Sequence, residues 1–159
     1  MPLEYVTGDP ILTDAQVLAI GHNARGRTEL SDLHTRLTQT YTTAYAMYSR
    51  QARKGKATSG TYWLWREAKP MLMFMTIRDS SVGATRLRYV QSAVINLARD
   101  YRLEALQSVA IAPLGQSHEW AEIKLILEQW LGPSKLPVVV YDTVQVGVKV
   151  AEPWSAGLG

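Results

Sequence analysis

The chain has 159 residues, of which 47% are hydrophobic, and it contains no cysteine. This length fits one compact domain with a sizeable core, and the lack of cysteine excludes disulfides, thiolate metal sites and cysteine nucleophiles. The chain shows no apolar run of the roughly 18 residues that a membrane span needs and no signal-peptide pattern, so we expect a cytoplasmic protein that does not bind membranes. The net charge of +3 favours anionic partners only weakly.

Two short strands are predicted near the beginning of the chain, over residues 3–7 and 17–20. Both runs are rich in β-forming or apolar residues. The first is followed by the turn signal Gly8-Asp9-Pro10, and the second is followed by Gly21. Both strands therefore lead into loops rather than into a tight hairpin.

A long amphipathic helix is predicted from Thr28 to about Lys54. Its apolar residues recur at three- and four-residue spacing, which is the pattern of one helical face; they are Leu30, Leu33, Leu37, Tyr41, Ala44, Tyr45 and Tyr48. The densest basic run of the chain, residues 50–56, follows at its end. Because cations favour the negative end of a helix dipole, a solvated helix terminus is the simpler interpretation of this run.

The second half of the chain alternates strands and helices. Residues 61–65 and 71–77 are predicted strands, and the second is apolar on both faces, as in a central strand covered by helices. Next come a helix over 87–101, a strand over 109–112, a helix over 119–131 and a strand over 137–141. This order predicts an α/β fold, a three-layer α/β/α sandwich around a mixed, mostly parallel sheet of about six strands.

We expect one domain over residues 1–145. Residues 146–159 are punctuated by Gly and Pro and are expected to form either a C-terminal edge strand or a flexible tail.

Ligands of open parallel sheets bind beyond the carboxyl ends of the strands, where loops and helix N-termini converge. Three loops of this chain are expected there: Gly8-Asp9, the loop between Gly21 and Gly26, and residues 113–117. A carboxylate accepts hydrogen bonds from an exocyclic amine, and glycines let backbone amides approach a phosphate. The three histidines show no regular ligand spacing and no thiolates accompany them, so no metal site is expected. No cofactor is expected either.

These motifs resemble the macro domain, in the branch of the DNA ADP-ribosyl glycohydrolase antitoxins and terminal ADP-ribose glycohydrolases. The resemblance rests on a strand followed by Gly8-Asp9, a strand ending in Asn23-Ala-Arg-Gly26, and a strand ending in Pro113-Leu-Gly115 before Glu119-Trp120. It spans roughly residues 3–142, and all landmarks keep their order.

The resemblance implies a binding site for ADP-ribose. Asp9 would hold the adenine amino group, Asn23 and the loop at Gly26 would face the distal ribose, and residues 113–117 would wrap the diphosphate. The candidate ligand-binding residues are Gly8, Asp9, Ile11, Asn23, Arg25, Gly26, Arg27, Leu114, Gly115, Gln116 and Ser117.

The chain also departs from the pattern. The glycine-rich segment after Pro113-Leu-Gly115 is shorter, and the position where relatives read Met-Gly-Lys-Gly is Arg27-Thr-Glu-Leu30. The lysine mechanism of the hydrolases therefore does not carry over. A loop with fewer glycines offers fewer amides to a phosphate, and Arg25, Arg27 and Arg78 are candidate substitutes.

The sequence leaves three functions open. The first is a module that binds ADP-ribose or a related adenine nucleotide, with ADP-ribosylated nucleic acid or protein as candidate targets. The second is an ADP-ribosyl glycohydrolase with another constellation, for which His22 and Glu119 are the titratable candidates. The third is a nucleic-acid or protein interaction module that uses residues 50–56 and the aromatic residues of the strand over 61–65.

Overall fold

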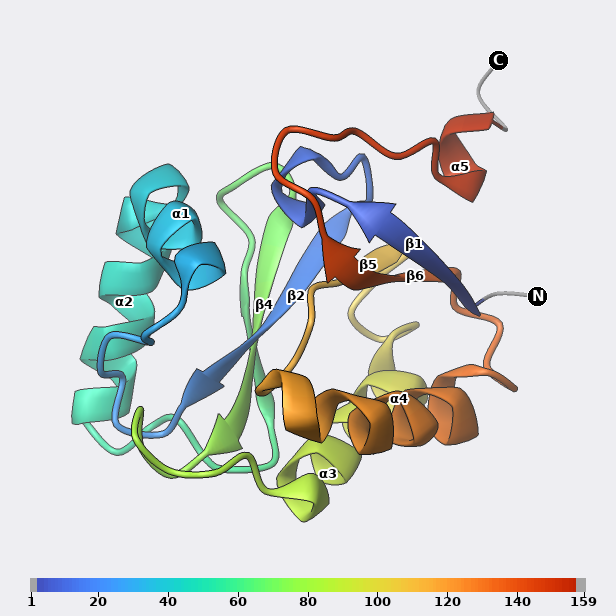
Figure 1. Cartoon of the computed structure of the whole chain (residues 1–159). Helices are drawn as coiled ribbons and strands as arrows, with labels where there is room; N and C mark the ends of the chain where they lie inside the picture. Colours follow the sequence, from blue (N-terminus) through green and yellow to red (C-terminus); the bar gives the residue numbers. More distant parts are fainter. Residues whose placement is uncertain (1–2, 157–159) are drawn as a thin grey trace.

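In a computed structural model that describes residues 3–156, six strands form one sheet (Figure 1). The strands are β1 (Leu3–Gly8), β2 (Val17–Asn23), β3 (Tyr62–Trp65), β4 (Met71–Arg78), β5 (Val109–Ile111) and β6 (Val138–Val144). Their spatial order is β1-β6-β5-β2-β4-β3, and every neighbouring pair is parallel except β3 and β4. The predicted mixed, mostly parallel sheet is confirmed.

Helices cover both faces of the sheet (Figure 1). The helices α1 (Asp32–Thr40) and α2 (Thr42–Arg53) lie on one face, and α3 (Leu87–Asp100) and α4 (Ser117–Leu131) lie on the other. A 3-10 turn, η1 (Pro10–Leu12), follows β1, and a short helix, α5 (Pro153–Ala156), lies near the end. The predicted three-layer α/β/α sandwich is thus confirmed. Across residues 3–156, none of the helices has the length and apolar character that crossing a membrane requires.

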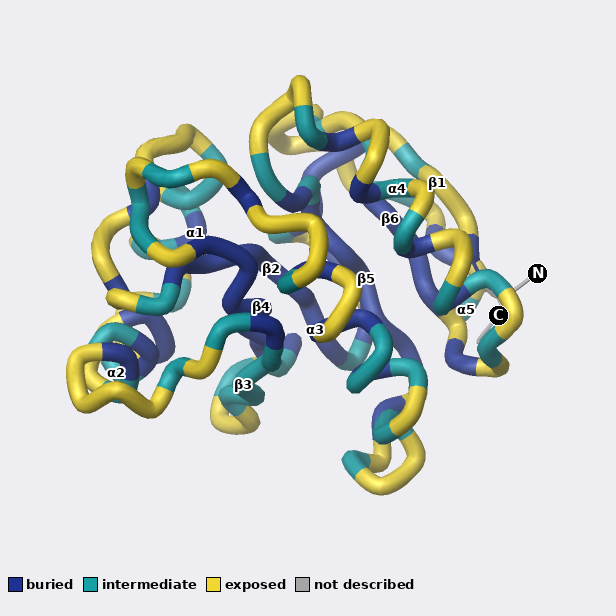
Figure 2. Tube along the Cα trace, turned by 90° about the horizontal axis from the view of Figure 1, so that it is seen from below, coloured by how far each residue is buried: buried dark blue, intermediate teal, exposed yellow. Residues whose placement is uncertain are grey.

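The central strands alternate their side chains between two hydrophobic layers. In β2, Val17 and Ala19 pack with α3 and α4, whereas Leu18 and Ile20 pack with α1 and α2. All seven residues of β2 and seven of the eight in β4 are buried, as the dark tube in Figure 2 shows. Continuous burial is typical of parallel strands covered on both faces, so the expectation of a central strand over residues 71–77 is confirmed.

The long helix expected from Thr28 to Lys54 is instead two helices that meet at Tyr41. Ser31 caps α1, because its hydroxyl accepts a hydrogen bond from the backbone N–H of His34, so residues 28–31 precede the helix. Around the break, the hydroxyls of Thr38, Thr40 and Thr42 donate to the carbonyls four residues earlier. Such bonds compete with the helical ladder and bend helices.

The segment after β6 crosses the end of β1 and forms no strand between residues 145 and 152. The N–H of Asp9 donates to the carbonyl of Val148 over 2.8 Å. Glu152 anchors the segment, because its carboxylate is 1% exposed and accepts hydrogen bonds from four donors. These donors are the Thr13 hydroxyl, the Asp14 N–H, the Tyr141 hydroxyl and the Trp154 indole.

Candidate functional site

A cavity of about 460 Å³ opens at the carboxyl ends of the parallel strands. Gly21 of β2, Arg78 at the end of β4, Pro113 after β5 and Val144 at the end of β6 contribute to its lining. The first turn of α1 and the loops before α1, after β4 and before α4 supply the other lining residues, which are Glu29, Leu30, Ser31, Leu33, His34, Ser81, Val82, Gly115 and Gln116. The cavity therefore lies where the sheet topology places ligands in open α/β folds.

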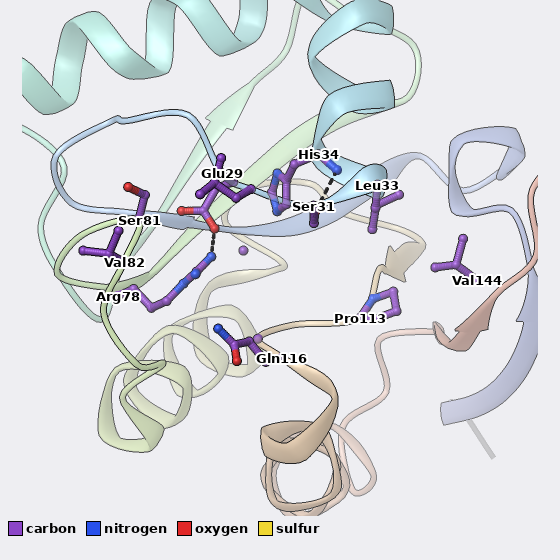
Figure 3. Close-up of a pocket in the computed structure, with 13 residues that line it drawn as sticks. Glu29, Ser31, Leu33, His34, Arg78, Ser81, Val82, Pro113, Gln116 and Val144 are labelled. Atoms are coloured by element: carbon purple, nitrogen blue, oxygen red, sulfur yellow. Dashed lines mark hydrogen bonds and ion pairs between the residues drawn. The ribbon is translucent and has the colours of Figure 1, made fainter.

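One wall of the cavity carries a buried ion pair between Arg78 and Glu29 (Figure 3). Their side chains are 10% and 2% exposed, and Glu29 also accepts a hydrogen bond from the Asn23 amide. The Nε atom of Arg78 is buried and has no hydrogen-bond partner among the described residues. Burial lowers the pKa of Arg78, although an arginine side chain remains protonated in proteins. The wall thus holds a fixed guanidinium with one unused donor.

The loop before α4 forms the facing wall, which Gln116 marks in Figure 3. Gly115 has a φ of +73°, and a Cβ atom there would lie 2.7 Å from Glu119 Oε1 and 2.9 Å from Ile123 Cδ1. Only glycine fits this turn without strain. Gln116 is the N-cap of α4, so the positive end of the helix dipole lies beside the cavity.

Glu119 completes a capping box rather than facing the cavity. Its Oε1 accepts from the Gln116 N–H over 2.7 Å, and its Oε2 accepts from the Thr85 N–H over 2.9 Å. Burial alone would raise the pKa of Glu119, but these hydrogen bonds outweigh it and hold the pKa below its ordinary value. The carboxylate that was predicted to be catalytic is therefore ionised and used for structure.

The mouth of the cavity is apolar and exposed. Leu30 is 83% exposed and Val82 is 86% exposed, and both line the opening. His34 lies deeper, where its Nδ1 is 2.9 Å from the Tyr45 hydroxyl. Burial lowers the pKa of His34 to about 4, so this ring is neutral at pH 7.

Asp9 lies outside the lining of this cavity and is already bound by protein groups. Its Oδ1 accepts from the Ile11 N–H, and its Oδ2 accepts from the Gly147 N–H and forms an ion pair with Arg36. Burial would raise the pKa of Asp9, but these partners together lower it. Gly8 and Ile11 belong to the same segment, and the Gln145 N–H donates to the carbonyl of Gly8.

Asn23 uses its whole side-chain amide to shape the loop that follows β2. Its Oδ1 accepts from the N–H groups of Arg25 and Arg27, and its Nδ2 donates to the Arg27 carbonyl and to Glu29. Gly26, with a φ of +67°, packs directly on α2, where a Cβ atom would lie 2.8 Å from Ser49 Cα. The side chains of Arg25 and Arg27 line a separate groove.

His22 is 2% exposed, and its ring lies in an aromatic cluster between the sheet and α2. Its ring centroid is 4.4 Å from that of Tyr48 and 5.9 Å from that of Phe74, and its Nδ1 accepts from the Asn23 N–H. Desolvation, helped by the charge of Arg78, lowers the pKa of His22 to about 3. His22 is therefore a neutral core residue and is not among the cavity's lining residues.

Of the predicted site residues, the structure brings Gly115 and Gln116 into the cavity lining, together with Pro113 of the same loop and Arg78, a predicted substitute for the missing amides. Leu114 is fully buried beneath the loop, and Ser117 is the exposed first residue of α4. Sequence reasoning missed the lining residues around the start of α1, above all Glu29 in the preceding loop and His34 in the first turn of the helix. The end of β4 and the loop after it contribute Arg78, Ser81 and Val82 to the lining. Because β4 runs parallel to β2, the rule that ligands bind beyond the carboxyl ends of parallel strands applies to this loop as well.

The sequence matches no model of a known protein family and no curated protein. Solved structures nevertheless share its fold. The macrodomain of Thermus aquaticus DarG is 18% identical, with a TM-score of 0.78 over 89% of this chain and 96% of that one. A macrodomain protein from Streptomyces coelicolor is 18% identical, with a TM-score of 0.72 over 91% and 99%.

Thermosipho africanus DarTG, solved in complex with ADP-ribose, is 17% identical with a TM-score of 0.80. The match covers 94% of this chain and 43% of that longer one. At these identities the likeness concerns the fold alone. We conclude that this chain has the macrodomain fold.

Proposed function

We propose that this chain binds ADP-ribose, or a closely related adenine diphosphate, in the cavity at the strand ends. The observation that carries the proposal is that two groups able to bind anions line opposite walls of this cavity. The Gly115-Gln116 turn at the N-terminus of α4 forms one wall, and the buried guanidinium of Arg78 forms the other. A structure of the same fold holds ADP-ribose.

The diphosphate is the part of the ligand that this arrangement fits best. Helix N-termini and glycine turns bind phosphates through backbone N–H groups. The Arg78 guanidinium belongs to the cavity lining, and an arginine adds a charge-assisted hydrogen bond to a phosphate oxygen. Arg78 thus supplies part of what the shorter glycine loop lacks. The volume of about 460 Å³ is within the usual range for small-molecule sites.

The adenine end has less support than the diphosphate end. Oδ2 of Asp9 already accepts from Gly147 and pairs with Arg36, so only Oδ1 retains a free lone pair for an adenine amino group. The Asp9 carboxylate is also 1% exposed and lies outside the cavity lining, so we propose that affinity depends chiefly on the diphosphate.

Hydrolysis of an ADP-ribosyl bond is the weaker proposal. A general acid or base must reach the proton that it transfers. His22 lies in the core with its Nδ1 occupied, and both carboxylate oxygens of Glu119 accept hydrogen bonds from backbone N–H groups, those of Gln116 and Thr85. Binding without strong catalysis is the function that these contacts favour.

The test is a calorimetric titration of ADP-ribose into the protein and into two variants with the same change of charge. Leu30→Glu places a carboxylate at the cavity mouth, and Leu103→Glu places one at a remote site with 86% exposure. At a separation of roughly 7 Å, repulsion of two phosphate charges weakens binding about three- to tenfold after salt screening. Leu103→Glu is expected to bind like the unmodified protein.

Competition with ADP, AMP and ribose 5-phosphate identifies the part of the ligand that is recognised. ADP is expected to compete, and ribose 5-phosphate is expected to compete poorly. An absence of saturable ADP-ribose binding to the folded protein, or equal weakening by both variants, would contradict the proposal.

A further inference from the structure

Six basic side chains gather on one surface outside the candidate cavity, and we name this surface the basic patch. It consists of Arg25, Arg27, Arg50, Arg53, Lys54 and Lys56, all of which are exposed. Two grooves of about 470 Å³ each run through it, and Arg53 lines both. Within residues 3–156, none of these six side chains forms an ion pair or a side-chain hydrogen bond with another described residue. Five of these cations therefore line two grooves that share Arg53, and within the described residues none of the six is neutralised.

Charge is distributed unevenly over the molecule because of this patch. The chain holds 17 Lys and Arg against 14 Asp and Glu. Without the six patch residues, acidic residues outnumber the remaining 11 basic ones. The stretch from residue 33 to residue 66 contains no Asp or Glu at all. A modest net charge therefore hides a strongly positive face on an otherwise acidic protein.

The fold places Arg25 and Arg27 beside the end of α2 by specific contacts. The Ser49 hydroxyl of α2 donates to the Gly26 carbonyl over 2.7 Å, and the positive φ of Gly26 lets the loop lie directly on the helix. Asn23 Oδ1 accepts from the N–H groups of both arginines, so their backbone is fixed. The two guanidiniums are therefore presented on a rigid support.

Stabilisation of the helix end explains only part of this arrangement. Cations at the last turn of α2 interact favourably with its dipole, but Arg25 and Arg27 come from a separate loop. The carbonyls of Arg50, Gln51 and Ala52 are already bound by backbone N–H groups. Bringing further cations to this end adds repulsion, which an anionic partner would relieve.

We propose that the basic patch binds the phosphate backbone of a nucleic-acid strand, without reading its sequence. Guanidiniums and ammonium groups that neutralise successive phosphates supply most of the affinity in such contacts. A membrane surface fits less well, because membrane-bound surfaces combine cations with exposed apolar side chains. None of the exposed large hydrophobic residues among residues 3–156 belongs to the patch. The inference does not depend on what occupies the cavity.

The experiment measures fluorescence anisotropy of labelled single-stranded DNA, duplex DNA and single-stranded RNA, each about 20 nucleotides long, over a salt series starting near 50 mM. The test variant is Arg25→Ala/Arg27→Ala. The control is Arg88→Ala/Arg102→Ala, which removes the same charge from exposed residues of and after α3. Thermal unfolding of each variant confirms that it is folded.

We expect the unmodified protein to bind at low salt and lose affinity steeply as salt rises. Each phosphate contact contributes about 0.7 to the logarithmic salt slope for a single strand, so the test variant is expected to lower the slope by about 1.4. Its dissociation constant should rise at least about tenfold, and the control should change much less.

Three outcomes would overturn the proposal. One is the absence of binding to every nucleic acid at low salt. Another is an equal loss in the test and control variants, which would show that net charge alone matters. The last is binding of anionic phosphatidylserine vesicles, abolished in the test variant, without binding of nucleic acid.

Discussion

Replacement of His22 by Asn distinguishes a structural histidine from a catalytic one through the pH dependence of stability. Burial lowers the pKa of His22 to about 3 in the folded protein, against an ordinary value near 6.5. Below pH 6.5, the unfolded chain therefore binds a proton that the folded chain rejects, so stability is fully present at neutral pH and is lost as the pH falls.

The size of this loss follows from the two pKa values. Between pH 6.5 and its own pKa in the folded protein, each buried neutral histidine costs about 1.4 kcal/mol of unfolding free energy per pH unit. From pH 7 to pH 5, His22 accounts for about 2 kcal/mol, and His34, with a pKa of about 4, accounts for a similar amount. The unmodified protein is therefore expected to lose about 4 kcal/mol over this range, and His22→Asn about half of that.

Urea unfolding at pH 7, 6 and 5 measures this difference, with unfolding free energies taken from the midpoint and slope. Asn retains an oxygen acceptor for the Asn23 N–H but does not titrate, so the comparison concerns the pH dependence rather than the absolute stability. The exposed His118→Asn variant is the control. A pH dependence in His22→Asn equal to that of the unmodified protein would show that His22 is accessible to protons and would refute its placement in the core.

Three further substitutions test other contacts. Gly115→Val is expected to destabilise the protein by about 1–3 kcal/mol and to abolish ADP-ribose binding, because φ is +73° and a Cβ atom meets Glu119 and Ile123; unfolding and calorimetry measure both effects. Glu29→Gln leaves the Arg78 guanidinium unpaired and should cost about 3–5 kcal/mol in urea unfolding, whereas Glu29→Gln/Arg78→Gln should recover much of this stability. Glu152→Gln replaces one carboxylate oxygen by an NH2 group, so two of the four donors that Glu152 now binds lose their acceptor. Trypsin should therefore cleave after Lys149 faster than in the unmodified protein. An unchanged cleavage rate would contradict the role of Glu152 as an anchor.

Hydrophobic periodicity predicted the layers of this fold because burial fixes the pattern directly. Strand β4 reads as a continuous apolar run since both of its faces are covered, and α4 buries Trp120, Ile123 and Leu127 at helical spacing. The break at Tyr41 escaped the same reasoning. The apolar stripe continues across it, and the competing signal is the hydrogen bonding of Thr38, Thr40 and Thr42, which periodicity does not weigh.

The position of the candidate site was predictable, but most of its side chains were not. Topology places loops at the carboxyl ends of parallel strands, which located the turn at Gly115. The state of Asp9 depends on Arg36 and on Gly147, which lies far away in sequence. A carboxylate beside a strand looks available to a ligand until such distant partners are known.

A single buried side chain, Asn23, positions both surfaces to which a function is proposed. Its Nδ2 holds Glu29, the partner of Arg78 in the cavity wall, and its Oδ1 holds the backbone of the loop that carries the patch arginines. Loss of this amide is therefore expected to weaken ligand binding in the cavity and nucleic-acid binding at the patch together. By contrast, Leu30→Glu changes only the cavity. Arg25→Ala/Arg27→Ala removes the two guanidiniums but keeps the hydrogen bonds that Asn23 makes to the backbone of these residues. Only these exposed variants separate the two activities, because each leaves the shared support in place.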